Sequence, residues 1–84
     1  MISYLKGSLR KLPLSNSKLE ILVNGIGYEV LLPVFVFESL HLKQLEINDE
    51  IELEIYYHAT ERSPKPILVG FNSIQEKNFF EQII

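Results

Sequence analysis

Residues 23–30, Val-Asn-Gly-Ile-Gly-Tyr-Glu-Val, constrain the fold of this chain more than any other segment. Asn24-Gly25 stands between two runs of alternating apolar and polar residues, and this dipeptide favours a type I′ turn, in which both central residues have positive φ. Gly27 lies in the returning strand, where a glycine weakens pairing unless a bulge or a close backbone approach requires it. The segment therefore predicts a tight, kinked β-hairpin between strands at residues 18–23 and 27–32.

Three further segments have the composition of strands, at residues 2–9, 50–57 and 67–71. The clearest is 50–57, in which apolar residues at 51, 53, 55 and 57 alternate with glutamates at 50, 52 and 54. Residues 34–42 are ambiguous, because their β-branched and aromatic start suits a strand, whereas Val34, Phe37 and Leu40 follow a helical spacing; we favour a short helix. Residues 58–66 are polar and contain two prolines, so we expect a projecting loop.

The last twelve residues have the pattern of a helix. Ser73-Ile74-Gln75-Glu76 forms a capping box, and apolar residues then recur four apart at 79 and 83 and at 80 and 84. No C-capping signal follows, so we expect residues 73–84 to begin a helix that leads into a further domain, and residues 1–72 to form a barrel. Five strands with a helix after the third predict an all-β OB-fold barrel of Greek-key topology, with an SH3-type barrel as the alternative.

Composition excludes several functions. A formal charge of -3 over 84 residues counts against a free-standing nucleic-acid binder, and the absence of cysteine excludes disulfides and thiolate metal sites. No apolar run approaches the length of a membrane span, which predicts a cytoplasmic protein. His41 and His58 lack partners at ligand spacing, and no nucleophile–base pair stands out, so we expect no metal, no cofactor and no catalysis.

Three segments of the chain carry a family resemblance. They are Met-Ile-Ser-Tyr-Leu-Lys-Gly at residues 1–7, the hairpin at 23–30, and Val-Gly-Phe-Asn-Ser at 69–73 with Gln75-Glu76 and Phe80. Together they resemble the RuvA family, whose members are the Holliday-junction-binding subunits of a bacterial branch-migration complex. The resemblance implies an N-terminal scaffold domain of a homotetramer that holds four-way junction DNA in recombination and repair. It also implies a following helix-hairpin-helix domain that grips the DNA, a third domain that engages a RuvB-type motor ATPase, and a RuvC-type resolvase as a further partner.

The resemblance also implies an acidic pin on the loop between the last two strands. Glu61 matches one of the pin acids, whereas Thr60 replaces the usual basic residue and Arg62 replaces the second acid. The alternative is that Glu61 is an ordinary loop acid. A second functional hypothesis is a generic OB-fold module that binds single-stranded nucleic acid or oligosaccharide through Tyr56 or a basic patch in residues 6–18. Phe35 is a further candidate for base stacking, whereas the alternation of its strand predicts that Tyr28 fills the core.

Overall fold

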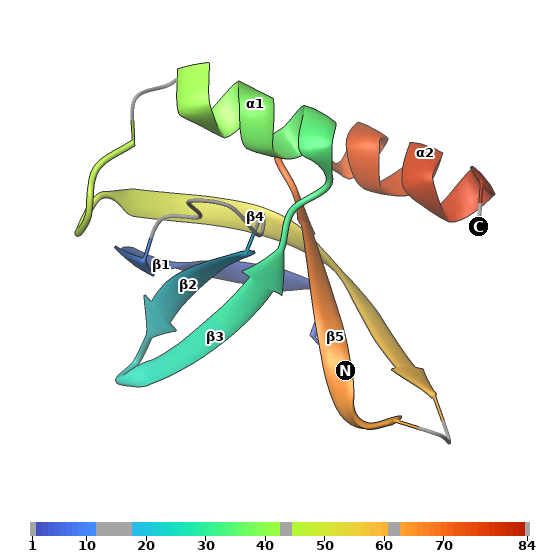
Figure 1. Ribbon diagram of the computed structural model, residues 1–84, viewed down its shortest axis with the longest axis horizontal. Coiled ribbons are helices and arrows are strands. Elements are labelled where there is room, and N and C mark those ends of the chain that lie inside the picture. Colours follow the sequence, from blue (N-terminus) through green and yellow to red (C-terminus); the bar gives the residue numbers. More distant parts are fainter. Residues whose placement is uncertain (1, 12–17, 43–44, 61–62, 84) are drawn as a thin grey trace.

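The computed structural model describes residues 2–11, 18–42, 45–60 and 63–83. Within these residues the strands form a closed barrel in the order β1-β2-β3-β5-β4, and two helices lie along one end of it (Figure 1). The elements are β1 (Tyr4–Lys11), β2 (Lys18–Val23), β3 (Ile26–Leu31), α1 (Val34–Leu42), β4 (Glu50–Thr60), β5 (Ser63–Phe71) and α2 (Ile74–Ile83). This architecture confirms the predicted five-stranded OB-fold barrel with a short helix after its third strand and a helix at the end.

The β2–β3 hairpin has the predicted turn. Asn24 and Gly25 both have positive φ, 51° and 81°, as a type I′ turn requires. The predicted kink at Gly27 is wrong, because the strand register runs without a shift from Lys18↔Leu31 to Val23↔Ile26. A close approach explains the glycine instead, since the carboxylate of Glu20 occupies the space that a Cβ at position 27 would need.

The predicted loop at residues 58–66 is wrong, because both neighbouring strands continue into it. β4 runs to Thr60 and β5 starts at Ser63, and these two residues pair with each other. Two prolines within β5 argued against a strand, since proline cannot donate to a ladder. They are tolerated because, among the described residues, the one register pair between β5 and β3 is Leu31↔Val69, so the first part of β5 is an edge strand that pairs with β4.

The core lies inside the barrel and beneath α1. The predicted helix is confirmed as α1, but its fully buried residue is Val36, whereas Val34 of the predicted apolar spacing is exposed. The predicted alternation at residues 50–57 is confirmed, since Ile51, Leu53 and Ile55 are buried and Tyr57 is partly buried against the core. The buried apolar residues are Leu5, Leu9, Leu19, Ile21, Val30, Leu32, Val36, Ile51, Leu53, Ile55, Leu68, Val69 and Phe71.

A turn at residues 46–49 connects the α1 side of the molecule to β4. Asn48 has a positive φ of 78°, and the Asp49 N–H donates to the Glu46 carbonyl at 3.1 Å. Two hydrogen bonds hold the turn to β1, from Asn48 N–H to the Leu9 carbonyl and from Leu9 N–H to the Asp49 carbonyl. The turn leads directly into β4 and holds the start of this strand beside β1.

Candidate functional site

The paired ends of β4 and β5 extend away from the barrel as a two-stranded arm (Figure 1). The arm holds the register pairs Tyr57↔Leu68 and His58↔Ile67 and closes at Thr60↔Ser63, with a register shift between His58 and Thr60. Glu61 and Arg62 stand between its two strands in the sequence and lie outside the described residues. The arm is therefore the element that would carry an acidic pin, and the role of Glu61 stays a prediction.

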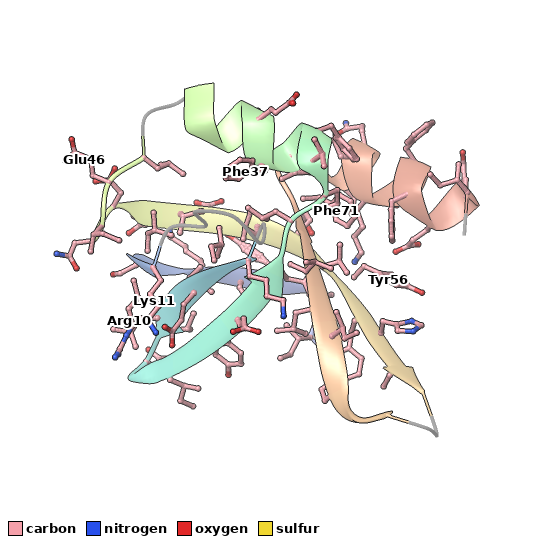
Figure 2. The ribbon with its side chains drawn as sticks, in the orientation of Figure 1. Arg10, Lys11, Phe37, Glu46, Tyr56 and Phe71 are labelled. Carbon is pink, nitrogen blue, oxygen red and sulfur yellow. The ribbon has the colours of Figure 1, made fainter. Side chains whose placement is uncertain are left out.

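The basic residues near the start of the chain face carboxylates. Lys6 Nζ lies 3.5 Å from Glu50 Oε1, and Lys18 Nζ lies 3.5 Å from Glu29 Oε1. Arg10 Nε and Lys11 Nζ lie 3.6 and 3.7 Å from the same oxygen, Glu20 Oε2 (Figure 2 labels both cations). Exposed pairs of this kind contribute little to stability, about 0–1 kcal/mol each. They do cancel the positive field that a single-stranded nucleic-acid site on this patch would need.

Glu20 is the member of this network that sequence reasoning missed. Its side chain is only 24% exposed, packs over Gly27 and meets two cations from β1. The link follows from the strand register, which places Lys11 opposite Glu20 after a shift in the β1–β2 pairing. In the sequence, the signal that a side chain packs over the hairpin is the glycine at position 27.

An acidic strip runs along the outer face of β4 beside β1. Tyr4 pairs in register with Glu54, and Lys6 pairs with Glu52. Partial removal of the phenol from water, a hydrogen bond with Glu52, and the charges of Glu52, Glu54 and Glu50 raise the pKa of Tyr4 above its usual value of 10.0. Among the described residues, Lys6 is the cation paired with the glutamates of this face, so negative charge exceeds positive charge there. The face would therefore repel phosphates.

Aromatic rings form a chain from β4 across α2 to α1. The Phe80 ring lies edge-on to Tyr56 at 5.6 Å and tilted against Phe71 at 5.2 Å, and Phe71 in turn lies 6.4 Å from Phe35. Figure 2 shows Tyr56 directed toward α2 and Phe71 between the helices and the sheet. The expectation that Tyr56 offers an exposed contact is wrong, because α2 half-buries it.

The other predicted candidates separate clearly. Tyr28 is partly buried against the core, as predicted, and Phe35 is 44% exposed with its ring turned to Phe71. His58 is exposed and stacks on Tyr56 with a centroid distance of 6.1 Å. The His41 side chain lies outside the described part of the chain. Among the described residues no three histidine or carboxylate side chains gather as metal ligands, and no helix is long and apolar enough to cross a membrane.

The joint between the barrel and α2 is a capping box. The Glu76 N–H donates to Ser73 Oγ at 3.2 Å, which confirms half of the predicted motif. The Glu76 carboxylate reaches back one residue further than predicted and accepts from the N–H of Asn72 at 2.9 Å. The Asn72 side-chain nitrogen is buried and meets no acceptor among the described residues.

An open groove of about 760 Å³ runs beside α2 over the outer face of β4 and β5. Leu31, Val69 and Ile67 contribute apolar side chains from the sheet, while Lys77 and Glu81 line it from the helix. The groove shows that α2 does not lie flush on the barrel. The contacts that hold the helix are therefore few, and Phe80 is prominent among them.

Comparison with known proteins identifies the family. Residues 1–65 match the family model described as the RuvA N terminal domain. The chain is 46% identical over 84 residues to a protein of Desulfatibacillum aliphaticivorans and 47% identical over 85 residues to one of Desulforapulum autotrophicum, and both matches cover the whole chain. A protein of Vibrio parahaemolyticus is 38% identical over 80 residues, or 93% of the chain.

All three relatives are described as the Holliday junction branch migration complex subunit RuvA. The chain spans 39%, 37% and 36% of their respective lengths, so it matches only part of each relative. The barrel, the helix after its third strand and the β4–β5 arm fall in the segment that these comparisons match. The chain belongs to the RuvA N-terminal domain family.

Proposed function

We propose that this chain is the N-terminal scaffold domain of a Holliday-junction-binding subunit, which holds four-way DNA junctions for branch migration in recombination and repair. The observation that carries the proposal is the match of the whole chain, at 46–47% identity, to relatives described as branch-migration subunits. In this proposal the domain catalyses nothing itself and works in the cytoplasm. A RuvB-type ATPase supplies the motion, and a RuvC-type resolvase acts on the same junction.

The charge distribution supports a scaffold more than an independent DNA-binding domain. The cations of residues 6–18 that the structure describes lie within 4 Å of carboxylates, and β4 carries an acidic strip. In this proposal the grip on DNA comes from a helix-hairpin-helix domain entered through residues 73–84, and four copies assemble into a homotetramer. Two of the candidate surfaces of a generic single-stranded nucleic-acid binder are weakened, because Tyr56 is half-buried and the basic patch is paired with carboxylates. Phe35 is 44% exposed, but its ring is turned to Phe71.

The β4–β5 arm is the part of the domain that would enter the junction. Its paired ends project from the barrel, and Glu61 lies between Thr60 and Ser63 in the sequence. A carboxylate at that position would repel phosphates and help to keep separated strands apart. The repulsion between like charges a few ångströms apart is about 1 kcal/mol in water and grows where water is excluded.

The test uses a protein of the relatives' length that carries this sequence as its first 84 residues. It should retard a four-way junction far more strongly than a linear duplex of the same length, in a gel assay at one fixed salt concentration. Equal retardation of the two DNAs would contradict the proposal. Light scattering on the same protein should give the mass of a tetramer.

The pin is tested separately by Glu61→Gln, with Glu38→Gln on the exposed side of α1 as the matched control. We expect Glu61→Gln to change the branch-migration rate in the presence of the ATPase and to leave junction affinity within about twofold. An unchanged rate would remove Glu61 from the pin role without affecting the scaffold proposal.

A further inference from the structure

The place of α2 on the barrel depends on few contacts. The helix has no fully buried residue, and Ile74, Phe79 and Ile83 are 46%, 60% and 65% exposed. Most surface helices are held by a continuous apolar stripe against a core. Here an open groove lies beside the helix on the outer face of β4 and β5, so a small number of contacts must set its direction.

The first contact is at the start of the helix. The Glu76 carboxylate accepts the N–H of Asn72, and its own N–H donates to Ser73 Oγ, so both ends of Glu76 tie the first turn to the end of β5. The Lys77 N–H also donates to the Ser73 carbonyl at 3.2 Å, which continues the first turn. These bonds fix the angle at which the chain leaves the strand.

The second contact lies about one turn further on, four residues after Glu76. Phe80 is the partly buried α2 residue that packs on the core, and its ring is bracketed by Phe71 from β5 and Tyr56 from β4. Phe71 is fully buried and Tyr56 lies on the neighbouring strand, so the two rings hold the Phe80 ring in a fixed position. Edge-on and tilted ring pairs are directional as well as apolar.

We propose that Glu76 and Phe80 are positioning residues that together hold α2 in one direction relative to the barrel. Two separated points define the axis of a helix, whereas either point alone leaves it free to swing. The consequence for DNA binding rests on the proposed function. With α2 held in this direction, the DNA-gripping part of the longer protein lies against the β4–β5 arm. Neither residue contacts DNA in this proposal.

The direct test measures the spread of α2 directions in the 84-residue chain. The chain has no cysteine, so two spin labels can be placed unambiguously through Gln82→Cys on α2 and Ile26→Cys at the exposed start of β3. Pulsed electron paramagnetic resonance should give one narrow distance distribution. Glu76→Ala and Phe80→Ala should each broaden it, and amide exchange in α2 should become about fivefold faster on loss of the cap.

Conservative variants and a control make the result specific. Glu76→Gln retains an acceptor oxygen and Phe80→Leu retains apolar volume. The distance distributions of these two variants should therefore stay narrower than those of the corresponding alanine variants. Asn78→Ala changes an exposed amide on the same helix and should leave the distribution unchanged. A broad distribution in the unaltered chain, or narrow distributions in both alanine variants, would overturn the proposal. A loss of thermal stability without broadening would also overturn it, because that is the signature of a purely structural role.

A second measurement separates this inference from the proposed function. In the longer protein, Glu76→Ala should lower the ratio of junction to duplex affinity by about fivefold to tenfold, and Glu76→Gln should restore it. If the unaltered protein prefers the junction and Glu76→Ala leaves the ratio unchanged, the link between α2 direction and DNA placement is wrong. If the unaltered protein shows no preference, the proposed function fails, and the spin-label result still decides whether α2 is held.

Discussion

The barrel and α2 are held in different ways. The barrel is closed by antiparallel pairing between neighbouring strands, except for the parallel pairing of β3 with β5, and it is filled by buried side chains, so each residue is supported by many others. α2 has no buried residue and depends on one capping box and one half-buried ring. A substitution in the barrel should therefore lower the free energy of unfolding, whereas a substitution at the joint should widen the range of directions that α2 adopts. Four substitutions test this difference between the barrel and α2, and they follow in order of decreasing expected effect.

The largest effect is expected from Phe71→Ala. Phe71 is fully buried and supports both Phe35 and Phe80, so its loss leaves a cavity where the barrel and both helices meet. The free energy of unfolding should fall by about 3–5 kcal/mol, measured by urea denaturation. Phe79→Ala is the control, because Phe79 is 60% exposed, and it should change the free energy by about 0.5 kcal/mol or less. Comparable losses in both variants would contradict the comparison.

Gly25→Ala should have a smaller effect within the barrel. Gly25 has a φ of 81°, which an L-residue with a Cβ adopts at a cost of about 1–2 kcal/mol. No atom lies within 4 Å of the added Cβ, so the cost should come from the backbone alone. The urea midpoint should fall without a change in the slope of the transition. A change in slope would indicate that the hairpin had lost its compact pairing.

Ser73→Ala should act on the joint and hardly on the barrel. It removes the acceptor for the Glu76 N–H, and a lost N-cap costs about 1 kcal/mol. Hydrogen exchange should become faster in α2 and stay unchanged in β1 and β2. Gln75→Ala, at an exposed position in the same turn, serves as the control. Uniformly faster exchange through the barrel would mean that the two regions are not separable.

The smallest effect concerns the acidic strip on the outside of the barrel. The pKa of Tyr4 is raised in the folded state, so the stability it contributes is present below pH 10 and is lost as the pH rises through the folded value. Glu52→Gln removes a charge and weakens the hydrogen bond, and should lower the pKa of Tyr4 toward 10. Carbon-13 NMR of the tyrosine ring would follow the titration. A Tyr4 pKa that is unchanged in this variant would show that Glu52 does not contribute to the shift.

Patterns confined to one strand or one turn predicted the corresponding structure well. The alternation at 50–57 identified which side chains are buried, and Asn24-Gly25 identified the hairpin, because both depend only on neighbours in the sequence. The prolines at 64 and 66 led to the wrong prediction of a loop, because the energetic cost of a proline in a strand depends on whether the strand has a second partner. That is settled by barrel closure, which brings Leu31 and Val69 together from distant parts of the chain.

The candidate site was predicted less completely for the same reason. Alternation correctly placed Tyr56 on the outer face of β4, but the sequence does not show that α2 returns to cover it. The Glu20 network depends on a register shift between β1 and β2, which no local pattern encodes. Glu61 rests on family resemblance and stays a prediction.

The pairing of β1 with β4 has a consequence for synthesis of the chain. Lys6 and its neighbours find their second partner only when Glu52 and the rest of β4 have been made, about 46 residues later. At about 5–20 residues per second, the ribosome leaves this edge of β1 without its partner for a few seconds. An exposed edge invites pairing with another nascent chain, and a lysine in the middle of it discourages such pairing. Lys6 would thus protect the unfinished barrel before β4 supplies its carboxylate partners.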